Sequence, residues 1–404
     1  MTKSEKIEKK IQEIVGNEYS VLLRNSFIQL APIMTILGIG LFSYAILLQF
    51  GFYHINVWTM LSTNVYGYTC IGASFLIMKK MVGKSQGNNN EIGVEVLIYL
   101  ALFLFTYASS NPSLTLLTIG STSIIPSLIL GFIYHIIYQL VRKLELRNPK
   151  ASTVPQAVID VLNNTWYHGI VLLGTIIVSM FSPLYDWLVK LSLICLNFFN
   201  QPIIVGMIIL VICLFWWKGI HGVTVIGLFL RPFWFQMLAL NGAAYLTQQT
   251  IPYIFHESFF QWVIWIGGSG ATIGLSICLK LFSKSKRFKL LAKTGIVSTI
   301  FNINETVMYG MPIANNRYLV IPFILSPLIN GLVGYWFITQ GFLENIFLTV
   351  PWVFPAPLGL FFATGGDLTA ILVSSLLIFF STVIYFPFFI KIDKLELFKE
   401  QLES

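Results

Sequence analysis

One acidic residue lies in a polar segment between apolar stretches of the chain. This residue is Glu305, and Asn302, Asn304 and Thr306 flank it. An ionisable group at membrane depth is costly, so its presence there points by default to a function. Three roles are open from the residues alone. The carboxylate could accept hydrogen bonds from adjacent sugar hydroxyls, carry a proton or an ion, or pair with a buried Lys or Arg as part of the structure.

A histidine in a glycine-rich segment is the second candidate. His221 lies between Gly219 and Gly222, and glycine permits tight backbone turns and the close approach of a ligand. An imidazole can donate a hydrogen bond to a hydroxyl or accept one from it. The alternative is a core histidine that is satisfied within the protein. We interpret the remaining histidines as interfacial or structural: His54, His135, His168 and His256.

Two tryptophans adjoin polar or proline-rich segments. Trp216 precedes the segment of His221, and Trp352 lies in the run PWVFPAP. An indole face stacks well on the apolar face of a pyranose ring. An aromatic ring beside a carboxylate and an imidazole is therefore typical of a sugar site. The alternative for both residues is the interfacial anchoring that we expect of most Trp residues in this chain.

Other reactive residue types have structural interpretations. Asp367 follows two glycines before an apolar stretch, where Asp is a preferred helix N-cap, and Arg231 has no partner identifiable from the sequence. The sequence contains no GxSxG, HExxH or Walker A pattern, so we expect no catalytic machinery, no cofactor and no metal site. The cysteines have no CxxC spacing and read as small core residues: Cys70, Cys195, Cys213 and Cys278.

Composition identifies the elements that position these residues as membrane helices. Of the 404 residues, 56% are hydrophobic and 10% are charged, and the mean hydropathy is +0.78. Because soluble domains average about 25% charged residues, an ordinary soluble enzyme is excluded. A disordered or nucleic-acid-binding chain is excluded for the same reason. The net charge of +8 arises from Lys and Arg clusters between apolar runs, a pattern typical of cytoplasmic loops.

Stretches free of Asp, Glu, Lys and Arg predict the membrane elements. Since about 20 apolar residues cross the hydrocarbon, these stretches correspond to roughly ten elements. Two of them are long enough for two spans each, namely 25–78 and 96–141. The others are expected to hold one element each: 161–185, 191–217, 258–279, 318–343, 345–366 and 368–390.

The positive-inside rule places the basic clusters in the cytoplasm and leaves one element unpaired in the second half. Between Lys293 and Lys391 the number of crossings must be even, yet three apolar stretches lie there. One element must therefore enter the membrane and return on the same side. Such broken elements mark substrate sites in transporters. We expect breaks at 218–222 continuing to Arg231–Pro232, at 301–312 and at 351–357, the last followed by 365–367.

The breaks predict two halves within an all-α polytopic membrane protein. About ten transmembrane helices plus re-entrant hairpins are expected. Residues 1–24 read as a cytoplasmic amphipathic segment, 25–200 as a membrane scaffold and dimerisation half, 201–390 as a substrate-binding transport half with re-entrant segments, and 391–404 as a cytoplasmic C-terminal tail.

Several motifs then resemble a known family. The run FNINETVMYGMPIANNRYLVIPFILSPLING resembles the signature of the lactose/cellobiose/diacetylchitobiose membrane components (enzyme IIC) of the bacterial phosphoenolpyruvate-dependent sugar phosphotransferase system. Three further segments match in the family's order: WWKGIHG, GGSGATIGL, and VPWVFPAPLGLFFATGGDLTAILV with the later YFPFF. These matches cover about residues 210 to 395, while the N-terminal half agrees mainly in hydropathy and in NPKASTVPQAV.

The resemblance implies a homodimer in which the first five spans form the dimer contact and later spans with two re-entrant hairpins hold the sugar. Glu305 and His221 correspond to residues that bind the sugar near the hydroxyl to be phosphorylated. Trp216 and Trp352 fall where the family places stacking tryptophans, and two asparagines would shape the site. The implied substrate-binding set is Glu305, His221, Trp216, Trp352, Asn302, Asn304 and Gly222.

The resemblance also implies partners. The sugar would be phosphorylated by a phosphocysteine on a IIB protein that is itself supplied by IIA. We expect both to be separate chains and this chain to carry no phosphoryl group, although Glu305 could assist deprotonation of the acceptor hydroxyl. The chain departs from the family pattern at several positions, among which Lys218 replaces a phenylalanine and Thr306 replaces a proline.

The sequence therefore predicts a disaccharide permease subunit in the bacterial cell membrane, with cytoplasmic N and C termini. A rigid, elevator-like movement of the sugar half would present the disaccharide inside. One alternative is a repurposed paralogue, marked by Lys218 and Thr306, that acts as an ion-coupled or passive carrier, or as an exporter, of another small solute. A second alternative is a non-transporting membrane sensor or partner-docking subunit.

Overall fold

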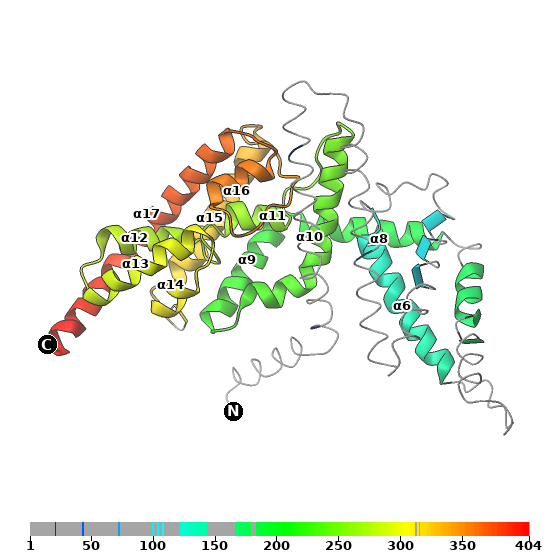
Figure 1. Cartoon of the computed structure of the whole chain (residues 1–404), viewed down its shortest axis with the longest axis horizontal. Coiled ribbons are helices and arrows are strands. Elements are labelled where there is room, and N and C mark those ends of the chain that lie inside the picture. The colour runs from blue at the N-terminus through cyan, green and yellow to red at the C-terminus, as the bar shows by residue number, and fades with distance from the viewer. Residues whose placement is uncertain are drawn as a thin grey trace. The chain divides into compact units, whose positions relative to one another are not determined.

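A computed structural model describes residues 122–143, 166–167, 169–178, 183–311, 313–314 and 316–403, together with isolated earlier positions. Throughout this part of the chain the regular secondary structure is helical, which confirms the predicted all-α class (Figure 1). The predicted segment 1–24, most of the stretch 25–121 and the connector NPKASTVPQAV lie outside the described residues. Two compact units adjoin in the sequence at Cys195 and Leu196.

The first unit contains α6 (Ile124–Arg142), a helix at Gly169–Val178 and most of α8 (Leu184–Phe199). Helix α6 is long and apolar enough to cross a membrane, and its apolar span Ile124–Val141 lies within the predicted stretch 96–141. The core of this unit is rich in tyrosine. Tyr107 and Tyr185 meet edge to face with ring centroids 5.0 Å apart, and Tyr185 also hydrogen-bonds Ser123.

Three long apolar helices of the second unit are also long enough to span a membrane. They are α10 (Gly222–Leu246), α15 (Val320–Thr339) and α17 (Thr369–Glu403). Helix α17 packs against α12 (Ile273–Phe282), α15 and α16 (Ala356–Ala363). It is therefore the element around which this unit is assembled.

The predicted break through Arg231–Pro232 is wrong. Helix α10 runs without interruption through Pro232, and the break is confined to Lys218–His221, between α9 (Pro202–Trp217) and α10. A proline removes one backbone hydrogen bond, which a long, packed membrane helix tolerates. The charge of Arg231 does not require a break either, because it is paired with Glu257.

Three predicted spans are not single helices. The stretch 258–279 begins with α11 (Glu257–Phe259) and the π-helix η1 (Phe260–Ile264), turns, and continues in α12. The cause is GGSG, where Gly267, Gly268 and Gly270 take φ values of +76°, +100° and +80°. The stretch 191–217 is divided between α8 and α9, and 345–366 contains only α16, whose 8 residues extend about 12 Å.

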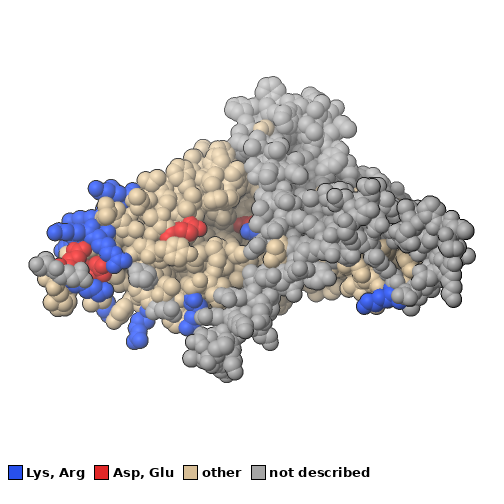
Figure 2. Space-filling view, turned by 60° about the horizontal axis from the view of Figure 1, so that its bottom comes forward, with Lys and Arg blue, Asp and Glu red and all other residues tan. Residues whose placement is uncertain are grey.

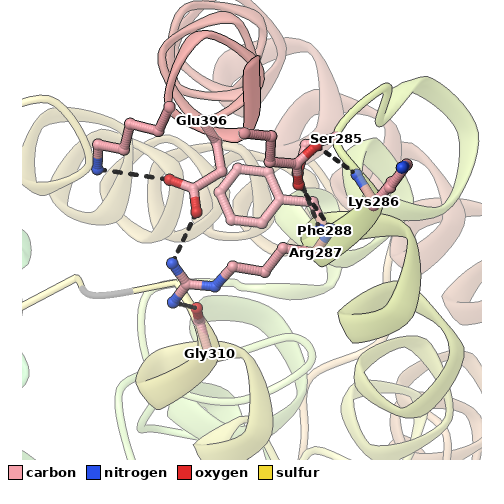
Figure 3. A network of polar contacts seen from close by, with 8 residues as sticks. Ser285, Lys286, Arg287, Phe288, Gly310 and Glu396 are labelled. Carbon is pink, nitrogen blue, oxygen red and sulfur yellow. Dashed lines mark hydrogen bonds and ion pairs between the residues drawn. The ribbon is translucent and has the colours of Figure 1, made fainter. Parts of the chain in front are cut away.

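The start of α13 (Lys286–Ile300) is held by carboxylates from the tail of α17, which lies beside it (Figure 3). Asp393 accepts hydrogen bonds from the backbone N–H groups of Lys284 and Ser285. Glu400 accepts hydrogen bonds from the Ser285 hydroxyl at 2.8 Å and from the two following backbone N–H groups at 3.0 and 2.9 Å. These N–H groups belong to a helix N-terminus and have no partner within the helix. We call this arrangement the α13–α17 clasp.

One arginine extends the clasp to α14 (Glu305–Gly310), which packs on α13. The guanidinium of Arg287 lies 2.7 Å from Glu396 and donates a second hydrogen bond, at 3.3 Å, to the carbonyl of Gly310 (Figure 3). The hairpin of α13 and α14 is thus fastened at its open end to α17. Its closed end, residues 301–304, carries the asparagines singled out from the sequence.

Candidate functional site

The closed end of the α13–α14 hairpin is held by Asn302. Its backbone adopts the left-handed conformation, with φ +60°. The side-chain oxygen accepts a hydrogen bond from the N–H of Gly267 at 2.9 Å, and the side-chain nitrogen donates to the carbonyls of Trp352 and Phe354 at 2.8 Å each. One amide therefore joins three segments that are far apart in the sequence.

Asn304 makes a second connection to the GGSG turn. Its side-chain nitrogen donates to the Ser269 carbonyl at 2.9 Å. A Cβ atom on Gly268 would lie 2.5 Å from Asn304 Cγ, so the close fit requires glycine at that position. Both asparagines are buried. The hydrogen bonds of both side chains are to backbone groups of the protein, so these asparagines fix the backbone on either side of Ile303.

Glu305 follows directly as the first residue of α14. Its side chain is exposed. Among the described residues it has no ion-pair partner, and no side-chain hydrogen bond is formed by its carboxylate. Structural pairing with a buried Lys or Arg, one of the three roles left open by the sequence, is therefore not observed among the described residues.

His221 occupies the break before α10 and caps that helix. Its Nδ1 accepts a hydrogen bond from the Thr224 N–H at 3.2 Å and lies 2.9 Å from the Thr224 hydroxyl oxygen. A neutral imidazole that accepts at Nδ1 carries its proton on Nε2. Because the residue is exposed, this N–H can donate to a ligand.

Trp216 supports His221 from the other side of the break. The two ring centroids are 4.3 Å apart, with an interplanar angle of 48°. The indole is only 5% exposed, so it braces the imidazole and presents little of its face. Lys218, the departure from the family pattern, is exposed and places its ammonium 4.5 Å above the ring of Trp217 instead.

Gly222 allows the two helices that flank this break to approach closely. A Cβ atom there would lie 2.2 Å from the Ile212 carbonyl oxygen of α9. That is well inside contact distance, so no larger residue fits without movement of α10. The sequence predicted that this glycine allows close approach of a ligand. In the structure it allows close approach of the α9 backbone.

Glu305 and His221 interact electrostatically with each other, and His221 also interacts with Arg231 of an ion pair. The charges of both Glu305 and Arg231 act on His221. Arg231 Nε lies 3.3 Å from Glu257 Oε1, and the two side chains are 26% and 31% exposed. Figure 2 shows acidic atoms, with basic atoms beside some of them, in a recess in the middle of the molecule, away from the charged end. Sequence reasoning missed Glu257, although opposite charges in two apolar stretches were a signal for pairing.

Trp352 is bonded to the hairpin tip through its backbone carbonyl, and its side chain is exposed. Its carbonyl is bound by Asn302, while the residue is 55% exposed. Of the two tryptophans, this is the one that offers an indole face. Stacking on a sugar ring was predicted for both tryptophans, and the ring of Trp352 is exposed for it, whereas the ring of Trp216 is buried.

Several secondary expectations are confirmed. Asp367 accepts hydrogen bonds from the backbone N–H and the hydroxyl of Thr369, so it caps α17. His256 is fully buried, and its Nε2 lies 3.0 Å from the Ile346 carbonyl oxygen. Cys213 and Cys278 are buried free thiols, whereas Cys195, also expected in the core, is only half-buried.

The fold and this site define an α-helical membrane protein with broken helices around a carboxylate and an imidazole. The family model of the phosphotransferase system EIIC matches residues 33–327. This chain therefore belongs to the EIIC family, the membrane components of the phosphotransferase system.

Known relatives agree with this membership. The chain is 36% identical over 188 residues to the lichenan permease IIC component of Bacillus subtilis, covering 46% of this chain and 42% of the relative. It is 33% identical over 208 residues to the cellobiose-specific EIIC component of Lactococcus lactis, with coverage of 46% and 42%. The matched segments thus span about two fifths of these curated relatives.

One solved structure matches nearly the whole chain. It is the crystal structure of the transporter ChbC, the IIC component of the N,N'-diacetylchitobiose-specific phosphotransferase system. The TM-score is 0.82, the sequence identity is 22%, and the match covers 98% of each chain. At this identity the likeness shows that the fold is shared.

Proposed function

We propose that this chain is a sugar permease subunit of a phosphotransferase system. It binds a disaccharide of the cellobiose, diacetylchitobiose or lactose type and translocates it across the membrane for phosphorylation by a IIB protein. The observation that carries the proposal is the exposed Glu305, which lies at the tip of a hairpin held by Asn302 and within electrostatic reach of His221. Lactose and cellobiose, for which two of the family's relatives are named, are disaccharides of this type.

The proposed binding chemistry uses complementary groups. The Glu305 carboxylate accepts hydrogen bonds from two adjacent sugar hydroxyls, and the Nε2 proton of His221 donates to a neighbouring oxygen. The exposed ring of Trp352 covers the apolar face of a pyranose ring. Trp216 and Gly222 act on His221 by bracing its ring and by setting its backbone.

In the proposed reaction a phosphoryl group is transferred to one sugar hydroxyl. Its oxygen attacks the phosphorus of a phosphocysteine on IIB, an O–P bond forms, and the P–S bond breaks to release the cysteine thiolate. The hydroxyl proton leaves by way of Glu305 or water. The carboxylate thus orients the acceptor hydroxyl while this chain itself carries no phosphoryl group.

We further propose the organisation given by the sequence. Residues 25–200 form the scaffold and dimer contact of a homodimer, and residues 201–390 form the transport half. The segments 1–24 and 391–404 lie in the cytoplasm, consistent with the basic residues near both. The α13–α17 clasp would then face the cytoplasm.

The proposal is tested by uptake of labelled cellobiose, diacetylchitobiose and lactose into vesicles, with and without phosphorylated IIB. Wild type is compared with Glu305→Gln and with Asp186→Asn, a control at the start of α8 in the other unit. We expect sugar phosphate to accumulate in wild type and in the control, only with IIB, and not in Glu305→Gln. Uptake of unmodified sugar without IIB, or no uptake by folded protein, would overturn the proposal.

A further inference from the structure

The second unit contains a cavity of about 830 Å³ that shares no lining residue with the site around Glu305. It lies where α9 begins and where α10 and α15 end, and it continues along the loop after α15. Its volume is within the range of about 300–1,000 Å³ found for small-molecule sites. A disaccharide can therefore be accommodated.

The walls of this cavity are fixed by the protein. The Asn200 side-chain oxygen accepts hydrogen bonds from the N–H groups of Ile254 and Phe255 at 3.1 and 3.0 Å. Tyr335 stacks against Phe255, with ring centroids 5.3 Å apart and planes at 19°. On another wall Tyr245 stacks against Phe347 at 3.8 Å. These contacts make a preformed recess with aromatic sides.

The rim of the cavity carries four polar side chains. Gln248, Gln249, Thr250 and Glu344 line the cavity and are exposed. Within the described part of the chain, none of these four side chains takes part in a hydrogen bond or an ion pair. Two primary amides that both donate and accept, one hydroxyl and one carboxylate beside tyrosine rings form a set suited to a neutral polyhydroxylated ring.

The cavity and the basic clusters lie at opposite ends of α17. Asp367, before the first turn of α17, accepts a hydrogen bond from the Glu344 N–H at 3.0 Å. Asp393 binds the start of α13 in the α13–α17 clasp. The two aspartates are 26 positions apart, which corresponds to about 39 Å of helix, more than the hydrocarbon thickness of about 30 Å.

Charge indicates which end faces outward. Figure 2 shows Lys and Arg gathered at the end that carries the C-terminus of α17 in Figure 1. By the positive-inside rule this end is cytoplasmic, so the cavity opens on the outer side of the membrane. A solute arriving from outside would meet it before reaching Glu305.

We propose that this cavity is a second saccharide-binding site, which receives a disaccharide from outside before it passes to the site of Glu305. We call it the outer pocket, defined by Tyr245, Gln248, Gln249, Tyr335 and Glu344. The proposal rests on the proposed function, because a sugar can pass from this cavity to Glu305 only if the site of Glu305 binds sugar. The amides and Glu344 bind ring hydroxyls, and the tyrosines line the apolar sides.

Cysteine protection tests the outer pocket directly. Thr250→Cys removes one methyl group, replaces the hydroxyl by a thiol, and leaves the amides and Glu344 in place. Gln340→Cys is the matched control, since Gln340 is exposed at the end of α15 but does not line the cavity. Both are made in wild type and in Glu305→Gln and labelled in intact cells with a membrane-impermeant maleimide, and the parent proteins give the background from native thiols.

We expect both cysteines to react from outside and cellobiose to slow only Thr250→Cys. The slowing is about fourfold when the sugar is at three times its Kd, and it persists in Glu305→Gln. The proposal is overturned if Thr250→Cys is labelled only in opened cells, if both cysteines are protected equally or neither is, or if protection disappears in Glu305→Gln. Absence of sugar uptake by the wild-type protein would instead refute the proposed function. Failure of the outer pocket and failure of the proposed function are therefore distinguishable.

Discussion

The amide of Asn302 offers the sharpest test of how the hairpin is held. Replacing this residue by alanine removes three hydrogen bonds, to Gly267, Trp352 and Phe354, and places a Cβ-bearing residue without a compensating amide at φ +60°. Each hydrogen bond contributes about 1 kcal/mol, or about 3 kcal/mol for the three. The left-handed backbone adds about 1–2 kcal/mol for alanine.

Asn302→Gly separates the two contributions. Glycine adopts the left-handed conformation without strain, so this variant loses only the hydrogen bonds. We therefore expect the stability order wild type, Asn302→Gly, Asn302→Ala, with losses of about 3 and 4–5 kcal/mol by the same magnitudes. Asn197→Ala, at an exposed position in α8, is the control and should change stability by less than about 0.5 kcal/mol.

The assay is thermal unfolding of the purified protein in detergent, followed by tryptophan fluorescence, with disaccharide affinity measured in parallel. Both Asn302 variants should unfold at lower temperature and bind sugar more weakly, because Glu305 lies three residues further along the same hairpin. If Asn302→Ala were as stable as wild type, or more stable than Asn302→Gly, the hydrogen-bond and backbone argument would be refuted.

Three further predictions follow from local geometry. Gly222→Ala should lower the unfolding temperature and sugar affinity, because the added methyl meets the Ile212 carbonyl at 2.2 Å; unchanged values would contradict the close packing of α9 and α10. Hydrogen bonds from backbone N–H groups at the start of α13 and from a serine hydroxyl there hold the pKa of Glu400 below its usual value. Glu400 lies in the charged tail beyond Lys391, so its stabilisation should be present above about pH 4.3 and lost as the pH falls through the lowered pKa. Glu400→Gln should flatten this pH dependence of the unfolding temperature, and an unaltered profile would argue against the clasp. Trp352→Ala should weaken disaccharide binding about two- to tenfold, as expected for loss of ring stacking, while Trp336→Ala, at a similarly exposed position, should not.

Composition and capping rules predicted the class and several local features. The low charge and long apolar stretches are sufficient for an all-α membrane protein, because no other fold satisfies so many buried backbone groups within single segments. The cap formed by Asp367 and the break at Asn302–Asn304 also follow from local residue types. Such features depend on a few neighbouring residues, which a sequence displays directly.

Features that depend on backbone conformation or distant pairing could not be predicted. The stretch 258–279 is long and uncharged, yet glycines with positive φ interrupt it between η1 and α12. Conversely, Arg231–Pro232 looks like a break but continues as helix, because Glu257 pairs with the arginine from a different segment. Length and charge counts contain neither the sign of φ nor contacts between segments.

The central claim is that the exposed carboxylate of Glu305 binds the sugar. Equilibrium binding of labelled cellobiose, diacetylchitobiose and lactose to purified wild type, Glu305→Gln and Asp186→Asn tests it most directly. Hydrogen bonds to a charged group contribute about 1.5–3 kcal/mol each, so the site that contains Glu305 should lose at least about tenfold in affinity in Glu305→Gln, while binding to the outer pocket persists. Asp186→Asn should bind as wild type does. Equal affinity of wild type and a natively folded Glu305→Gln would contradict the account.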